Sequence, residues 1–384
     1  MSDSALAQHN QEVAALWHDF HEGRPARVPC HFNFGTQYRL LTPWMNPQPY
    51  SFRQYFEDPA VQWEVQLTLR KWVREQAFQD AEMGLPEEWP GLGPDYQNTI
   101  EAEWLGCRLE YREGEVPDSW PRLRDRKGDL AAMSIPDPIH DGVQARGVAC
   151  YQYFEERRQR EGFEGRPVGR SSLCGGGTDG PFTVACNLRG TTEVCLDLYE
   201  DPRYARELLD FVTEATIVRL KAVMKFSGTE FPQAGWGFAD DSIMLLSEAQ
   251  YREFVLPCHQ RLLSAFSLGG PNSIHLCGRV QHLLPMLQKE LNIQDFDLGF
   301  PVDLGQVRKS LGPGAMLHGN LHPMVLRDGP VSLIRQKTAA ILGSGVMEGG
   351  RYVFGEGNNV APGTPVEHFQ AAYETVKAVG AYDG

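Results

Sequence analysis

The sequence is poor in basic residues and has no long apolar run, and each absence excludes a class of function. Its 36 Lys and Arg residues stand against 50 Asp and Glu residues, which gives a formal net charge of −14. Polyanions bind to clustered cations, so we expect neither nucleic acid nor an anionic membrane surface as a partner. No apolar run approaches the length of a membrane span, and the N-terminus lacks the features of a signal peptide. We therefore expect a cytoplasmic protein.

Phosphate-binding and disulfide motifs are also missing. The Gly175-Gly176-Gly177 run lacks the lysine and the spacing of a nucleotide phosphate loop, so we do not expect nucleotide binding. The eight cysteines include no C-x-x-C pair. In a long chain without secretion signals, scattered cysteines are typical of free thiols, and we expect most of them to be small buried side chains.

Apolar periodicity predicts alternating strands and helices along most of the chain. Helical spacing marks residues 1–25, 52–80 and 140–160, and then 181–198, 201–226, 247–267, 279–290, 304–311, 325–342 and 365–379. The expected strands are Val28–Phe34, Thr99–Glu110, Val168–Leu173, Glu230–Trp236, Asn272–Leu276, Ile293–Leu298, Ala315–His318 and Arg351–Gly355. This alternation favours an α/β fold with one domain over residues 1–384, a (β/α)8 TIM barrel. Residues 1–25 would form an N-terminal helical extension, and residues 84–139 an insertion near the barrel mouth.

Ionisable and polar side chains gather at the predicted carboxyl ends of these strands, where barrels place functional groups. In one strand, His275 and Cys277 point to the same side, so they could share a zinc ion. The alternative is a buried His/Cys pair packed beneath a loop. A catalytic zinc site needs a third protein ligand, and the candidates are Glu356, Cys174, Asp240 and Asp241. The Asp240-Asp241-Ser242 run also fits a loop that leads into a helix.

Several motifs in residues 165–384 resemble the uroporphyrinogen decarboxylase superfamily. They are Thr178-Asp179-Gly180-Pro181-Phe182-Thr183, Val302-Asp303-Leu304, Leu311-Gly312, His318-Gly319-Asn320-Leu321-His322-Pro323 and Gly357-Asn358-Asn359-Val360-Ala361-Pro362-Gly363-Thr364-Pro365. The resemblance implies a (β/α)8 barrel. It also separates two branches, the true decarboxylases and the corrinoid-dependent methyltransferases, which bind zinc through a His-x-Cys-Gly stretch like His275–Gly278.

The sequence departs from both branches. True decarboxylases carry an arginine-rich stretch after the first strand that anchors substrate carboxylates, whereas residues 30–39 here contain no arginine pair. We therefore do not expect porphyrinogen decarboxylation. The methyltransferase branch places its third zinc ligand, a cysteine, where this chain has Asn358. Because an amide is a poor zinc ligand, we expect an acid, provisionally Glu356, to replace it.

The resemblance therefore implies a zinc-dependent methyltransferase that moves a methyl group between a small molecule and a corrinoid. His275, Cys277 and Glu356 would hold zinc, with Asp241 and Glu356 catalytic and with His31, Asp240, Asn320 and Asn358 binding substrate. A carboxylate ligand makes zinc more electrophilic than a thiolate does, which favours a methoxy or methylamine compound over a thiol. The chain has no Asp-x-His-x-x-Gly stretch, so the corrinoid would come in trans on a separate protein.

The sequence leaves open two alternative functions and the oligomeric state. A metal-free decarboxylase or lyase could use Asp240 and Asp241 as acid and base on the same barrel. A non-catalytic homologue could bind a small molecule without a third metal ligand. A homodimer is possible on either reading.

Overall fold

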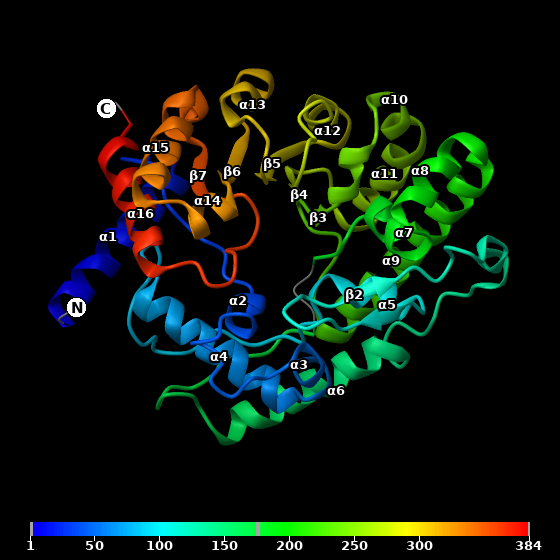
Figure 1. Ribbon diagram of the computed structural model, residues 1–384, viewed down its shortest axis with the longest axis horizontal. Helices are drawn as coiled ribbons and strands as arrows, with labels where there is room; N and C mark the ends of the chain where they lie inside the picture. Colours follow the sequence, from blue (N-terminus) through cyan, green and yellow to red (C-terminus); the bar gives the residue numbers. More distant parts are fainter. Residues whose placement is uncertain (1–2, 174–176, 383–384) are drawn as a thin grey trace.

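A parallel five-stranded sheet lies at the centre of the fold. The computed structural model describes residues 3–173 and 177–382, so the candidate ligand Cys174 lies outside the described residues. The strands follow one another in sequence order (Figure 1): β3 (Gly237–Ala239), β4 (Asn272–Leu276), β5 (Ile293–Leu298), β6 (Met316–Leu321) and β7 (Tyr352–Glu356). Extended segments continue this wall at both edges, where Cys30 bridges to Phe354 and Asp179 to Ala239, both in parallel.

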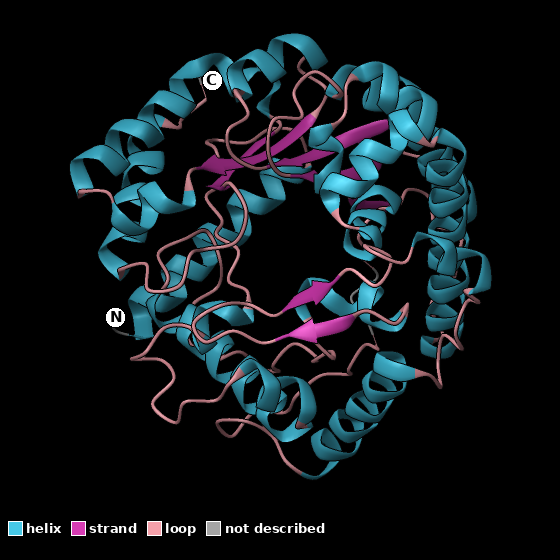
Figure 2. Cartoon of the chain, turned by 45° about the vertical axis from the view of Figure 1, so that its right-hand side comes forward, coloured by secondary structure: helices cyan, strands magenta, loops and turns pink. Residues whose placement is uncertain are grey.

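Helices form a ring outside these strands, as Figure 2 shows. The helices that follow the segment at Asp179 are α7 (Pro181–Arg189), α8 (Thr191–Glu200), α9 (Pro202–Ser227), α10 (Glu248–Gln250), α11 (Leu256–Phe266), α12 (Leu284–Leu291), α13 (Leu304–Leu311), α14 (Pro323–Asp328), α15 (Val331–Ile341) and α16 (Val366–Val379). From β3 onward, at least one helix separates each strand from the next. This alternation of inner strands and outer helices is the α/β barrel architecture that the sequence predicts.

The N-terminal part of the chain is mostly helical. It comprises α1 (Asp3–His21), α2 (Thr36–Leu40), α3 (Phe52–Glu57), α4 (Pro59–Gln76), α5 (Ile100–Trp104) and α6 (Gly142–Arg160), with a separate antiparallel hairpin, β1 (Arg108–Glu110) and β2 (Asp118–Trp120). Short 3-10 turns precede α5 (η1, Gln97–Thr99), precede α6 (η2, Lys127–Ala132) and follow β3 (η3, Asp241–Leu245). Among the described residues, no helix has the length and apolar character needed to cross a membrane.

Local sequence signals explain where several helices begin. The Ser51 hydroxyl accepts a hydrogen bond from the backbone N–H of Gln54, whose side chain accepts one from the Ser51 backbone N–H. This reciprocal arrangement satisfies two N–H groups that the first turn leaves unpaired. The same capping box joins Ser247 and Gln250 at the start of α10.

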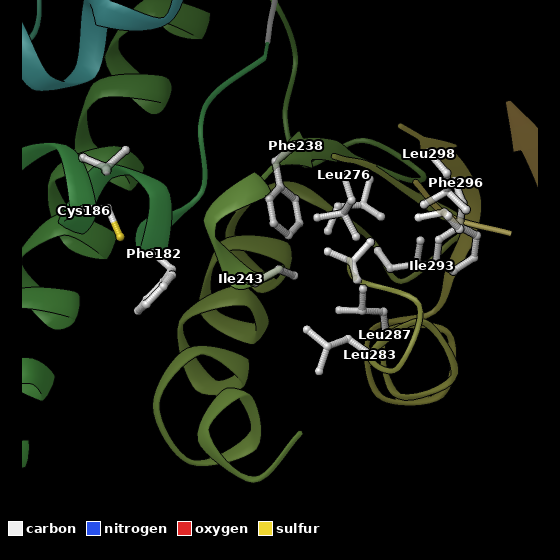
Figure 3. Packing of buried hydrophobic residues seen from close by; sticks show 14 of the residues in the cluster. Phe182, Cys186, Phe238, Ile243, Leu276, Leu283, Leu287, Ile293, Phe296 and Leu298 are labelled. Atoms are coloured by element: carbon white, nitrogen blue, oxygen red, sulfur yellow. The ribbon is translucent and has the colours of Figure 1, made fainter. Parts of the chain in front are cut away.

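The main core lies between the sheet and the outer helices (Figure 3). Ile274 and Leu276 of β4 and Phe296 and Leu298 of β5 alternate with polar neighbours, and all four are at most 2% exposed. Their alternation sends apolar side chains outward against the helices. The remaining positions of the same strands, such as His275, therefore face the inside of the barrel.

Four predicted strands were wrong by more than a shift of their bounds. Val28–Phe34 makes a single bridge, from Cys30 to Phe354, and no strand. Residues 100–104 form the helix α5, because Ile100 and Trp104 match helical spacing as well as strand alternation. The predicted strand Glu230–Trp236 ends before β3 begins at Gly237, and its Pro232 has no N–H for a sheet ladder. Val168–Leu173 makes a single bridge, from Val168 to Trp89, instead of a strand of the central sheet.

Candidate metal and substrate site

Three potential metal ligands converge at the carboxyl ends of β3 and β4. The ligand atoms of Asp241, His275 and Cys277 all lie within 4.8 Å of one another, and the three side chains are partly buried. The His275 Nε2 is 3.4 Å from the Cys277 Sγ and 3.9 Å from the Asp241 Oδ1. The predicted pair of His275 and Cys277 is thus brought together at the carboxyl end of β4, and Asp241 is the third member.

This donor set fits zinc in both chemistry and size. Zinc binds imidazole nitrogen, thiolate sulfur and carboxylate oxygen, each at about 2.0–2.3 Å, usually in tetrahedral geometry. Those bond lengths place two ligand atoms on one ion about 3.3–3.6 Å apart. The separations from His275 lie close to this range. A small movement of the Asp241 carboxylate would complete three ligands and leave the fourth position open.

Asp297 orients the imidazole of His275. The Asp297 Oδ2 is 2.7 Å from the His275 Nδ1, so this nitrogen carries the proton and the Nε2 faces Cys277. Burial alone would lower the pKa of His275, but its hydrogen bonds to Asp297 and Cys277 raise that pKa to about 11. A carboxylate behind the distal nitrogen is the usual support for a metal-binding histidine. The register of the sheet explains the contact, because His275 stands opposite Asp297 in the β4–β5 ladder.

The two adjacent aspartates have different surroundings. The Asp241 Oδ1 accepts a hydrogen bond of 2.7 Å from the backbone N–H of Cys277, which holds this carboxylate beside the thiol. Asp240 is fully buried and accepts hydrogen bonds from Thr183, from the Phe182 backbone N–H and from His259. These contacts join β3 to α7 and α11. These contacts give Asp240 a structural role. Its binding of substrate stays a prediction.

Glu356 lies outside the three-ligand group. Its Oε1 accepts a hydrogen bond from the Asn33 backbone N–H, while its Oε2 is buried and has no hydrogen-bond partner in the described residues. Burial, together with the nearby charge of Asp297, raises the pKa of Glu356 to about 8. Glu356 contributes no atom to the group of ligand atoms that lie within 4.8 Å of one another. The geometry therefore favours Asp241 over the provisionally predicted Glu356 as the third ligand.

The other predicted substrate-binding residues lie apart from this group. The Asn320 amide donates to the backbone carbonyl groups of Gly299 and Val302. Asn358 is exposed at the end of β7. His31 borders two other cavities, one of them beside Asn33 and Asn359. Their roles in substrate binding stay predictions.

A cavity of about 600 Å³ opens beside His275 within the barrel. Strand residues Ser273, Asp295 and Asp297 line one side, and Gln97, Asn98 and Glu101 from the 84–139 segment line another, together with Thr178, Asp179 and Phe238. On this wall the Asp295 Oδ1 is 2.9 Å from the His318 Nε2. The volume suits a small organic molecule.

Sequence reasoning missed Glu101 and Asp179 at this cavity. The Glu101 Oε1 accepts hydrogen bonds from the Thr178 hydroxyl and from Arg219 of α9, which forms a buried salt bridge with it at 2.7 Å. Burial raises the pKa of Asp179 well above its ordinary value, and the charges of Glu101, Asp240 and Asp241 add to this effect. Glu101 was missed because it lies in a helix that was predicted as a strand.

Comparisons with known proteins agree with this architecture. The chain is 27% identical over 291 residues to a uroporphyrinogen decarboxylase of Anaeromyxobacter sp. (strain Fw109-5), which covers 71% of this chain and 76% of the relative. It is 26% identical over 293 residues to a methylated-thiol--coenzyme M methyltransferase of Methanosarcina mazei, which covers 74% and 71%. A solved structure, a methyltransferase from Methanosarcina mazei, superposes with a TM-score of 0.64 at 19% identity and covers 94% of this chain and 96% of that chain. The family model described as uroporphyrinogen decarboxylase (URO-D) matches residues 96–379, more than half of the chain, and the protein therefore belongs to this family.

Proposed function

We propose that the protein is a zinc-dependent methyltransferase that moves a methyl group between a small substrate and a corrinoid carried by a separate protein. The observation that carries this proposal is the group formed by Asp241, His275 and Cys277 beside a cavity of about 600 Å³. The relative from Methanosarcina mazei that is named a methyltransferase supports it.

The three ligands would hold zinc with one position open toward substrate. Bound there, zinc would supply Lewis-acid chemistry, ionising a thiol or polarising the oxygen or nitrogen that carries the methyl group. The chain's own residues prepare this position. Asp297 keeps the proton of His275 on Nδ1, and the Cys277 backbone N–H holds the Asp241 carboxylate in place. These contacts fix the ligands before any substrate binds.

A corrinoid protein would approach the carboxyl ends of the strands. Several large apolar side chains are exposed in the segments that follow β3, β5 and β6: Met244, Leu245, Phe300 and Met324 are each 38–46% exposed. Exposed apolar side chains that gather in one patch are typical of surfaces that bind another protein. Their position supports docking of a partner at the end of the barrel where His275 lies.

Porphyrinogen decarboxylation is the second candidate, because several relatives carry that name. A substrate with many carboxylates needs free cations around it. Arg39, the one arginine in the segment 30–39, is buried, and its guanidinium donates to Thr68 and to the Met45 carbonyl group. The described lining of the cavity beside His275 contains no Lys or Arg. Both observations favour methyl transfer.

The test is methyl exchange with free cobalamin, followed through the cobalt absorbance. The zinc-loaded protein should demethylate methylcobalamin with a small thiol, or methylate Co(I) cobalamin from a methoxy or methylamine compound. The His275→Ala/Cys277→Ala double variant should lose this activity, whereas a His140→Ala/Cys195→Ala double variant, which changes the same residue types elsewhere, should keep it. Decarboxylation of a porphyrinogen together with no methyl exchange would overturn the proposal.

A further inference from the structure

The cavity beside His275 is lined by carboxyl groups and by no basic side chain of Lys or Arg among the described residues. Glu101, Asp179, Asp295 and Asp297 all border it, with the neutral amides Gln97 and Asn98. An anionic substrate would require cations in the same place. The wall therefore discriminates between substrates by charge.

Part of the negative charge of this wall is compensated within the protein. Glu101 pairs with Arg219 at 2.7 Å, and Asp295 pairs with His318 at 2.9 Å. Asp179 has no salt bridge among the described residues. It is held close to Glu101, whose carboxylate accepts a hydrogen bond from the Asp179 backbone N–H. Burial raises the pKa of Asp179 well above its ordinary value, and the charges of Glu101, Asp240 and Asp241 act in the same direction, whereas the charge of Arg219 lowers this pKa.

A bound zinc ion would not compensate the remaining negative charge of this wall. Two positive charges on zinc are balanced by the Cys277 thiolate and the Asp241 carboxylate, so the centre itself is neutral. His275 as a ligand is also neutral. The nearby cation left for Asp297, which lies 2.7 Å from the His275 Nδ1, is then His318, and His318 already pairs with Asp295.

The basic residues near the barrel interior either form hydrogen bonds with other groups or lie at the opposite end of the strands. A neighbouring cavity, which shares Gln97 and Asn98 with the first, contains Arg70 and Arg74. The Arg70 guanidinium donates to the Pro90 and Gly91 carbonyl groups, and Arg74 donates to the Gly84 carbonyl group and Glu82. A third cavity contains Arg351, which precedes β7 and therefore lies at the opposite end of the strands from His275.

From this arrangement we infer that the substrate carries an ammonium group, which binds among Asp179, Asp295 and Asp297 while its methylated heteroatom faces His275 and Cys277. The inference rests on the proposed function, because it names the substrate class of the same site. An ammonium group would supply the missing positive charge and donate hydrogen bonds to the carboxylates. A small methoxy, methylthio or methylamino compound that bears such a group fits the cavity volume.

The test is binding of three probes that differ in charge and share a methoxy group: 2-methoxyethylammonium, 1-methoxypropane and methoxyacetate. Ligand-observed NMR titrations would use the zinc-loaded protein and the His275→Ala/Cys277→Ala variant. We expect the ammonium probe to bind to the zinc-loaded protein at least about tenfold more tightly than the neutral and anionic probes. Asp179→Asn and Asp295→Asn should each weaken the ammonium probe severalfold and leave 1-methoxypropane unchanged. Asp125→Asn, which removes the same charge from an exposed loop, should change none of them.

Equal affinity for the three probes, a preference for methoxyacetate, or no binding of any probe would overturn the inference. The outcome is independent of catalysis. Selective ammonium binding without methyl exchange would refute the proposed function and keep the charge preference. Methyl exchange without a preference for the ammonium probe would support the proposed function and refute the charge preference.

Discussion

Glu356 allows the most quantitative prediction, because its carboxyl group is buried and one of the two carboxyl oxygens has no hydrogen-bond partner among the described residues. The residue is 5% exposed, its Oε1 accepts a hydrogen bond from the Asn33 backbone N–H, and its Oε2 has no hydrogen-bond partner among the described residues. Burial raises its pKa from 4.5 to about 8. Folding therefore favours the protonated form of this group.

The sign and size of the effect follow from this pKa difference. Below pH 4.5 the group is protonated in both the folded and the unfolded chain, so it does not make the free energy of unfolding depend on pH. Between pH 4.5 and 8 the unfolded chain loses its proton first, and stability falls as the pH rises. A difference of about 3.5 pKa units corresponds to about 5 kcal/mol above pH 8, as an upper limit. Glu356→Gln keeps the shape and abolishes the titration.

The assay is urea unfolding followed by tryptophan fluorescence, at a series of pH values from 5 to 9. The unfolding free energy of Glu356→Gln minus that of the wild type should increase with pH, by about 1.4 kcal/mol per pH unit at its steepest. Glu200→Gln, an exposed change of the same kind, should give a constant difference. The infrared band of a buried protonated carboxyl group should also be absent from the Glu356 variant at neutral pH. A constant difference for Glu356→Gln would refute the reasoning.

Three further predictions concern the residues around the site and a second, smaller core that contains Trp63, Trp89 and Phe154. Arg219→Met should lower the unfolding free energy by about 3–5 kcal/mol in urea titrations, because it leaves the Glu101 carboxylate buried without its cation, and adding Glu101→Gln should recover part of the loss. Asp297→Asn should weaken zinc affinity about 10–100-fold in chelator competition, since it removes the carboxylate that orients His275; unchanged affinity would contradict that role. Phe154→Ala should cost about 3–5 kcal/mol, because this ring is fully buried in the smaller core, and a loss below about 1 kcal/mol would show that the ring is not packed as described.

The predictions from sequence succeeded where a single local pattern determines the structure. Asn272–Leu276 and Ile293–Leu298 were predicted with the observed bounds, because apolar and polar residues alternate and a glycine follows each strand closely. The pairing of His275 with Cys277 needed only the two-residue period of a strand. Thr99–Glu110 was misassigned because its short apolar pattern fits a helix equally well.

The third ligand could not be predicted, because it depends on contacts between distant parts of the chain. The hydrogen bond from the Cys277 backbone N–H places Asp241 beside the thiol, and nothing in the Asp240-Asp241 pair indicates which residue is buried. Glu356 stood at a suitable strand end, but its carboxylate accepts a hydrogen bond from the Asn33 backbone N–H and lies outside the three-ligand group. Such differences in burial arise from packing and are not encoded in spacing.

Zinc content measured on untagged protein is the most direct test of the central claim, that Asp241 completes a metal site with His275 and Cys277. The protein would be equilibrated with one equivalent of zinc, dialysed against a weak chelator and analysed by atomic emission. We predict one zinc per chain in the wild type and in Glu356→Gln, and loss of the ion in Asp241→Asn and Cys277→Ala. Retention of zinc by Asp241→Asn with loss from Glu356→Gln, or a wild type that binds no zinc, would contradict the account.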